Sequence, residues 1–111
     1  MKQKENYLEK IPVRKTDIEC STDENNIVTL KVENKGAMNY LFQKLLRKPR
    51  YSYIHLDEMG SFVWPLIDGE NDIFAIGKEV EKHFGEKANP LYERLSQYFE
   101  ILKNNNFIEF K

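Results

Sequence analysis

The chain has 111 residues, 41% of them hydrophobic and 32% charged, with a formal net charge of −1 at pH 7. This length predicts one domain spanning residues 1–111, with a core large enough to fold without disulfides or structural metals. The single cysteine, Cys20, excludes an intramolecular disulfide and a cysteine-based metal cage. A lone cysteine, a charged start and no apolar run of about 20 residues favour a cytoplasmic protein without a membrane span.

The small net charge conceals two halves of opposite sign. Residues 1–55 carry eleven Lys or Arg against seven Asp or Glu, a balance of +4, and residues 56–111 carry six against eleven, a balance of −5. Such an asymmetry is typical of two differently charged faces of one domain. A functional alternative is a basic face that meets an acidic partner.

The first part of the chain predicts antiparallel strands. Residues 1–10 are polar and are expected to form a mobile arm, and Pro12 then favours an extended segment. Strands are predicted over 17–22 and 26–33, joined by the turn-forming sequence STDENN. Alternation with polar residues predicts the core face of the second strand: Val28, Leu30 and Val32.

A basic, amphipathic segment follows the hairpin. Its apolar residues recur at helical spacing and predict an inserted short helix over about 37–47, which Pro49 terminates. We expect this helix to pack on its own domain; an interfacial membrane anchor and a self-association surface at 38–46, which would give a homodimer, are the alternatives. Residues 51–56 return to a period of two and predict a third strand, with Tyr51, Tyr53 and His55 on one face.

The second half of the chain predicts a three-helix group. The first helix, over about 57–68, has Asp57 as its N-cap, Gly69 as its stop and an internal Pro65 that should bend or shorten it. Trp64 is expected on a flank of its buried stripe. The second helix is predicted over about 72–84, and the third over about 90–104 with Asn89 as N-cap and Pro90 at its first position.

We find no catalytic motif and no pattern that predicts a cofactor or a metal site. The chain lacks HExxH, GxSxG, CxxC and a glycine-rich phosphate loop, and His55 and His83 have no ligand spacing between them. Strands followed by three helices also suggest a winged-helix nucleic-acid binder. However, the helical half is net acidic, whereas DNA affinity comes chiefly from Lys and Arg.

The segment HLDEMGSFVWPLIDG at residues 55–69 resembles the signature of the PqqD family (coenzyme PQQ synthesis protein D). That signature has a strand ending in Leu-Asn/Asp, then Gly/Ala, an aromatic residue, Ile/Val and Trp, and a closing Asp-Gly. The later pattern from Leu102 to Ile108 also fits, so the resemblance covers about residues 51–108. Two features depart from the family pattern: the insertion at 37–48, which could cover the groove described next, and Pro65.

The resemblance implies an α+β, winged-helix-like domain without catalytic activity. Such a domain is a RiPP recognition element: it binds the leader segment of a ribosomally made precursor peptide and presents it to a modifying enzyme, often a radical SAM protein. The peptide would add as a strand in a groove between the third strand and the third helix. The implied contact residues are Tyr51, Tyr53, Ile54, His55, Tyr92, Leu95, Ser96 and Phe99.

Two basic residues complete the expected site. Lys48 and Arg50, at the entrance of the third strand, would steer an acidic leader peptide by long-range attraction. A winged-helix nucleic-acid-binding protein and a structural self-association module remain the alternatives.

Overall fold

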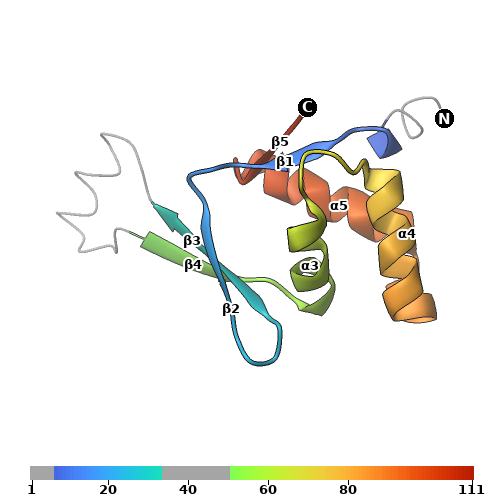
Figure 1. Ribbon diagram of the computed structural model, residues 1–111, viewed down its shortest axis with the longest axis horizontal. Helices are drawn as coiled ribbons and strands as arrows, with labels where there is room; N and C mark the ends of the chain where they lie inside the picture. Colours follow the sequence, from blue (N-terminus) through green and yellow to red (C-terminus); the bar gives the residue numbers. More distant parts are fainter. Residues whose placement is uncertain (1–6, 34–50) are drawn as a thin grey trace.

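The computed structural model describes residues 7–33 and 51–111, and it shows strands followed by helices, the predicted α+β class (Figure 1). The described chain forms a three-stranded sheet, a two-stranded sheet and a helical group. The inserted helix predicted at 37–47 lies outside the described residues, as does the basic pair Lys48 and Arg50.

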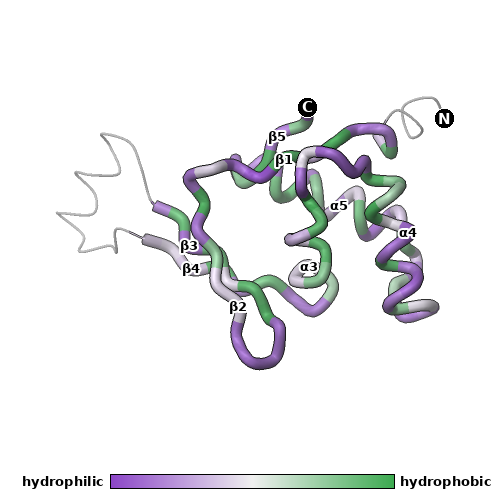
Figure 2. Tube along the Cα trace, viewed as in Figure 1, coloured by the Kyte–Doolittle hydropathy of each residue, from purple (hydrophilic) through white to green (hydrophobic). Residues whose placement is uncertain are grey.

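The three-stranded sheet is antiparallel in the order β2-β3-β4, with β2 over Glu19–Thr22, β3 over Val28–Glu33 and β4 over Tyr51–His55. These strands confirm the predicted ones with slightly shorter bounds. On the predicted core face, Val28 and Leu30 are buried. The β2–β3 turn is hydrophilic, as the sequence STDENN indicates (Figure 2).

A second, smaller sheet joins segments from both ends of the described chain. Strand β1, over Pro12–Arg14, pairs antiparallel with β5, over Ile108–Phe110, so that Pro12 lies opposite Phe110. The sequence predicted an extended segment at Pro12 but not its pairing with the end of the chain. Strand β5 also contributes to the core, because Ile108 is buried, as is the preceding Phe107.

The first helix of the group begins where predicted and ends earlier. Helix α3 spans Glu58–Val63, and the carboxylate of its N-cap Asp57 accepts a hydrogen bond from the Gly60 N–H at 2.7 Å. A 3₁₀ turn, η1 over Trp64–Leu66, then carries Pro65 at its start. Pro65 therefore shortens the helix, as expected, because its ring cannot continue the α-helical hydrogen bonds. Gly69, with φ +81°, lies in the following turn and is not the helix stop.

Helices α4, over Ile73–Phe84, and α5, over Leu91–Asn104, match the other two predictions closely. Asp72 caps α4 through its side chain, which accepts from the Ala75 N–H at 2.8 Å. The cap predicted at Asn89 is wrong. Asn89 ends the 3₁₀ turn η2, over Gly85–Ala88, and Pro90, after a cis peptide bond, is itself the N-cap of α5.

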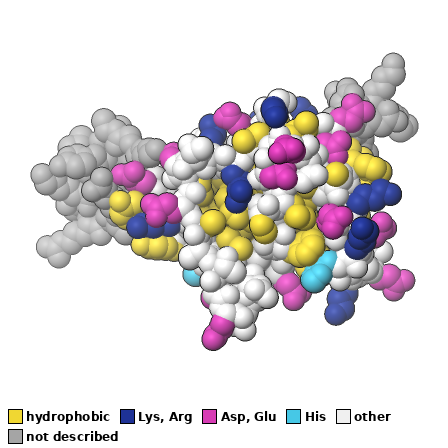
Figure 3. Space-filling view, in the orientation of Figure 1, with side chains coloured by type: hydrophobic (Ala, Val, Ile, Leu, Met, Phe, Trp, Pro, Cys, Tyr) yellow, Lys and Arg dark blue, Asp and Glu magenta, His cyan; other side chains and the backbone are white. Residues whose placement is uncertain are grey.

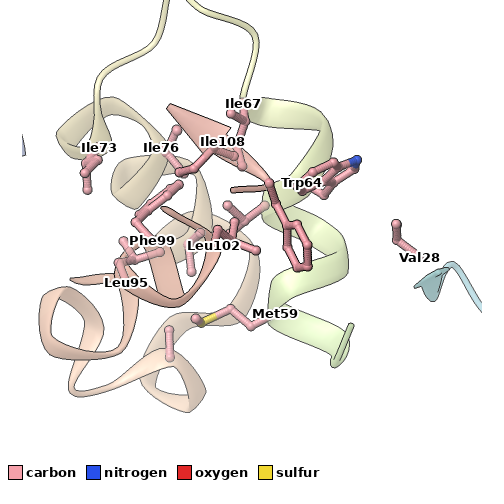
Figure 4. Packing of buried hydrophobic residues seen from close by; sticks show 14 of the residues in the cluster. Val28, Met59, Trp64, Ile67, Ile73, Ile76, Leu95, Phe99, Leu102 and Ile108 are labelled. Atoms are coloured by element: carbon pink, nitrogen blue, oxygen red, sulfur yellow. The ribbon is translucent and has the colours of Figure 1, made fainter. Parts of the chain in front are cut away.

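The core lies between α3, α4, α5 and the two sheets (Figure 4). The sequence placed Trp64 on a flank of the first helix, but its side chain is 2% exposed and belongs to the core. The 3₁₀ turn changes the angular spacing of its residues, so a stripe calculated for a continuous α-helix misplaces this ring. The fully buried side chains around it include Leu30, Val63, Ile67, Ile73, Ile76, Val80, Leu95, Phe99 and Ile108.

Residues 7–10 pack against the helices, so the expectation of a mobile arm at 1–10 does not fit this part of it. The Tyr7 hydroxyl donates to the Ser96 carbonyl at 3.3 Å, and its ring meets Phe110 edge-on at 5.9 Å. The Lys10 carbonyl accepts from the Ile73 N–H at 3.0 Å, at the start of α4.

Candidate functional site

The outer edge of β4 is the first component of the predicted site. Strand β4 is the last in the order β2-β3-β4, and no described strand pairs with its outer side. The Leu56 N–H donates to the Val28 carbonyl at 2.9 Å, which fixes the alternation of the ladder. The N–H and C=O groups of Ile54 therefore point toward β3, whereas those of Tyr53 and His55 point toward the outer edge.

Side chains on the outer face of the sheet are partly held in place by neighbours. Thr29 Oγ1 and His55 Nδ1 are 2.7 Å apart, and the Lys31 ammonium lies 4.3 Å from the centre of the Tyr51 ring. The Tyr53 side chain lies between these two pairs along β4 and is 60% exposed. The strand side of the predicted groove thus combines an accessible ring with outward-facing backbone groups.

The helix side of the predicted groove is arranged differently from the expectation. Leu95 and Phe99 are 0% exposed and belong to the core. The reason is their spacing on α5, because they share the inward face with Leu91 and Leu102. Their side chains can support a groove from beneath but do not line its surface.

Tyr92 and Ser96 lie on another side of α5. The Tyr92 ring stacks on Phe74 of α4, with ring centres 6.3 Å apart, and it packs so close to Gly77 that an added Cβ there would lie 2.8 Å from it. The Ser96 carbonyl accepts the hydrogen bond from Tyr7. These two residues therefore face α4 and the N-terminal segment.

A different face of α5 lies near the end of β4. The Tyr98 hydroxyl donates to the Gly60 carbonyl at 2.9 Å, and a Cβ on Gly60 would lie 2.9 Å from the Tyr98 ring and 3.5 Å from the Leu56 Cβ. Gly60 is thus where the end of β4, α3 and α5 meet. Arg94 and Ile101 lie one turn to either side of Tyr98, and Ile101 is 60% exposed.

The contact residues predicted on the third helix did not include Ile101 or Arg94, whose guanidinium donates to the Lys87 carbonyl at 2.8 Å. Periodicity gave no reason to choose the flank of the third helix next to the end of β4, where Tyr98 lies, over the flank next to α4. The available signal was Gly60, since a glycine in a helix permits close approach of a neighbouring element. We name Arg94, Tyr98 and Ile101 the α5 flank.

The electrostatics of this junction keep the Tyr98 phenol neutral. Burial raises the pKa of Tyr98 far above its usual value, and the Asp57 carboxylate raises it further. The hydroxyl therefore remains a hydrogen-bond donor to Gly60 at physiological pH. This bond fixes the angle between α5 and the start of α3.

Other chemistry is sparse in the described part of the chain. Residues 7–33 and 51–111 hold no cluster of three His, Cys, Asp or Glu side chains that could bind a metal. His55 is engaged with Thr29, and the His83 ring stacks on Phe62 at 4.4 Å. No helix in these ranges is long and apolar enough to cross a membrane.

Figure 3 shows hydrophobic side chains gathered over the middle of one face. A hollow of about 420 Å³ lies between the β2–β3 turn, α3 and the end of α4. Its walls include Ile27, Phe62, Leu66 and Phe84 beside His83. None of the predicted groove residues lines this hollow, so it is separate from the edge of β4.

A family model described as "Coenzyme PQQ synthesis protein D (PqqD)" matches residues 44–108, which is more than half of the 111 residues. The match contains β4, the helices α3, α4 and α5, and the start of β5. Neither the curated proteins nor the solved structures gave a match.

Proposed function

The chain belongs to the PqqD family, and from this membership we propose that it is an adaptor that binds the leader segment of a ribosomally made precursor peptide. The family is one of non-catalytic accessory proteins, and membership supports an adaptor role related to PQQ synthesis. The adaptor presents its peptide to a modifying enzyme, for which a radical SAM protein is the proposed class. All of residues 1–111 form one such domain in this proposal.

The observation that carries the proposal is the outer edge of β4. Tyr53 and His55 direct backbone donors and acceptors outward there, and an extended peptide can pair with them as an added strand. Main-chain pairing of this kind supplies affinity with little dependence on sequence. Selectivity then comes from the side chains beside the edge.

Two surfaces supply that selectivity. Tyr51, Tyr53 and His55 would meet peptide side chains on the outer face of the sheet. On the helix side, the α5 flank replaces the residues first predicted, because Leu95 and Phe99 are buried. Lys48 and Arg50 remain the predicted steering pair for an acidic leader.

The proposal is tested by NMR titration of the ¹⁵N-labelled chain with precursor peptides encoded near its gene. We expect the amide shifts to be confined to residues 51–56 and to α5, strongest on the α5 flank. A flat titration with every such peptide would overturn the proposal. Shifts centred on Phe74 and Tyr92 would retain peptide binding but reject the α5 flank.

A proline substitution separates main-chain pairing from side-chain contact. Tyr53→Pro removes an outward N–H and leaves the bonds between β3 and β4 intact, and edge strands tolerate proline. We expect it to weaken peptide binding about tenfold more than Tyr53→Ala, in line with about 1 kcal/mol for a lost hydrogen bond plus a blocked approach. Equal losses in the two variants would show that the ring, and not the backbone, binds the peptide.

Thr22→Pro is the matched control. The Asp23 N–H donates to the Ile27 carbonyl at 3.1 Å, so the ladder directs the Thr22 N–H outward on the opposite edge of the same sheet. This variant should bind peptide like the wild type. A duplex DNA titration at two salt concentrations tests the nucleic-acid alternative, for which affinity would fall steeply with salt.

A further inference from the structure

Trp64, the single tryptophan of the chain, has a buried hydrogen-bond donor without an acceptor. The side chain is 2% exposed, and Nε1 is the one buried side-chain nitrogen or oxygen of the described residues that has no partner. Leaving such a donor unpaired costs about 1–3 kcal/mol. Unpaired buried donors are rare in folded proteins, so this one calls for an explanation.

Trp64 is also one of the residues that line a second hollow, of about 210 Å³. In Figure 4 the indole nitrogen points away from Ile67, Leu102 and Ile108 and to the side on which Val28 lies, while the rest of the ring packs with the core. The hollow lies where the link from β1 to β2 passes Trp64. Its lining residues are Arg14, Lys15, Thr16, Ile18, Cys20 and Trp64.

Arg14 adds a second set of free donors to the same hollow. Its guanidinium lies over the Trp64 ring, 5.9 Å from the ring centre, and makes no hydrogen bond or ion pair with any residue of 7–33 or 51–111. Besides backbone hydrogen bonds, the Arg14 charge already acts on the Asp68 carboxylate and helps to lower its pKa. Asp68 accepts from the Glu70 and Asn71 backbones, and Glu109 pairs with Lys15 at 3.3 Å.

We propose that this hollow binds the carboxylate of an acidic side chain on a protein partner. One carboxylate oxygen would accept from the Arg14 guanidinium and the other from the Trp64 N–H, a charge-assisted arrangement that suits a planar anion. Nε1 is covered in this structure, so the exposed Arg14 side chain moves off the ring to admit the ligand.

The size and place of the hollow identify its occupant. Ligand pockets for small molecules have volumes of about 300–1,000 Å³, so a hollow of about 210 Å³ fits one inserted side chain better. Cys20 of β2 lies in its wall, so the hollow lies at the opposite edge of the sheet from β4. A peptide paired with β4 and an acidic group bound beside Trp64 can therefore be held at the same time.

The single indole N–H gives a direct measurement. A ¹H–¹⁵N spectrum of the full chain contains one indole cross-peak, which is titrated with acetyl-Gly-Glu-Gly-amide, with the matched Gln peptide and with sodium glutarate, all at constant ionic strength. We expect a saturable downfield shift with the Glu peptide and none with the Gln peptide. A saturable shift with glutarate, together with no shift with the Glu peptide, would overturn the assignment to a protein side chain.

Two variants complete the test. Arg14→Met keeps the stem over the ring but removes the guanidinium, and it should raise the midpoint of the Glu-peptide titration at least tenfold. Lys82→Met, which removes an exposed cation near Glu79, should leave it unchanged. An unmoved indole peak, or equal midpoints in wild type and Arg14→Met, would overturn the proposal, and circular dichroism checks that both variants are folded.

Discussion

Ser61 connects the sheet to the helices through a single hydroxyl. It is 4% exposed, accepts a hydrogen bond from the Val28 N–H at 2.8 Å and is 3.3 Å from the Leu56 carbonyl. Val28 begins β3, so its N–H would otherwise lack a strand partner at this point. The serine therefore replaces a ladder bond where the sheet meets α3.

Replacing Ser61 by alanine should destabilise the protein by about 1–3 kcal/mol, because the Val28 N–H is left buried without an acceptor. Urea unfolding followed by circular dichroism measures the change. Ser21→Ala, at an exposed position of β2, is the control and should change stability by less than about 0.5 kcal/mol. Equal effects of the two substitutions would contradict the role of Ser61.

At this scale the sequence predicted residues that act along one element and missed those that act between elements. Asp57 was predicted as a cap because the backbone N–H that donates to its carboxylate lies only three residues away in the chain. Ser61 accepts a hydrogen bond from Val28, and Trp64 lines a hollow together with residues of the segment 14–20. Both contacts join residues that are more than 30 positions apart in the sequence. Nothing in the local pattern identifies such partners, since they depend on how the elements pack.

Among the elements, α3 depends on its cap more than the longer helices do. It has six residues, against twelve in α4 and fourteen in α5. A short helix has few internal hydrogen bonds, so the bond from the Gly60 N–H to Asp57 is a large share of its total. The Asp57 carboxylate also lies at the positive end of the helix dipole.

We expect Asp57→Ala to lower the free energy of unfolding by about 1 kcal/mol, within the range of about 0.5–2 kcal/mol known for N-caps. Asp72→Ala, at the cap of α4, should have a similar or smaller effect. Glu79→Ala removes an exposed carboxylate from α4 without removing a cap and is the control. A cap variant as stable as this control would show that packing alone holds the helix start.

The helices and strands were predictable because their residues repeat at the right period and carry caps and turn residues. The site was less predictable. The outward direction of Tyr53 and His55 follows from strand alternation, but the flank of α5 that approaches β4 depends on the crossing angle at Gly60. The direction of Tyr92 toward α4 reflects its fit against Gly77, which no single-element pattern contains.

At the scale of the whole molecule, β5 closes the core. Ile108 is 2% exposed and lies in the strand that pairs with β1. Ile108→Ala should destabilise the protein by about 2–5 kcal/mol through the lost burial and the remaining cavity. Thermal unfolding measures this effect, with Glu109→Ala on the exposed side of the same strand as the control. Similar melting temperatures for the two variants would show that β5 is peripheral.

Three tyrosines couple the fold to alkaline pH. Burial is the largest cause of the raised pKa of Tyr7, Tyr92 and Tyr98, and neighbouring carboxylates raise the pKa further. Above about pH 10, the usual tyrosine pKa, the unfolded chain releases these protons and the folded chain retains them. The stability contributed by the neutral phenols is therefore complete below this pH and is lost as pH rises.

The pH dependence can be assigned to Tyr98, the tyrosine with the most strongly raised pKa. Between pH 9 and 11, stability of the wild type should fall more steeply than that of Tyr98→Phe, by up to about 1.4 kcal/mol per pH unit. Urea unfolding across this range measures both slopes, and lysine titration cancels in the comparison. Parallel slopes would mean that Tyr98 ionises freely in the folded state.

The pairing of β1 with β5 also determines how the domain can be joined to other polypeptides. Because Pro12 lies opposite Phe110 in an antiparallel pair, the chain enters and leaves the domain at neighbouring points (Figure 1). A protein with such adjacent attachment points can be inserted into a loop of a host, or circularly permuted, with short connections. The outer edge of β4 belongs to the other sheet, so an insertion made through β1 and β5 would leave that edge accessible.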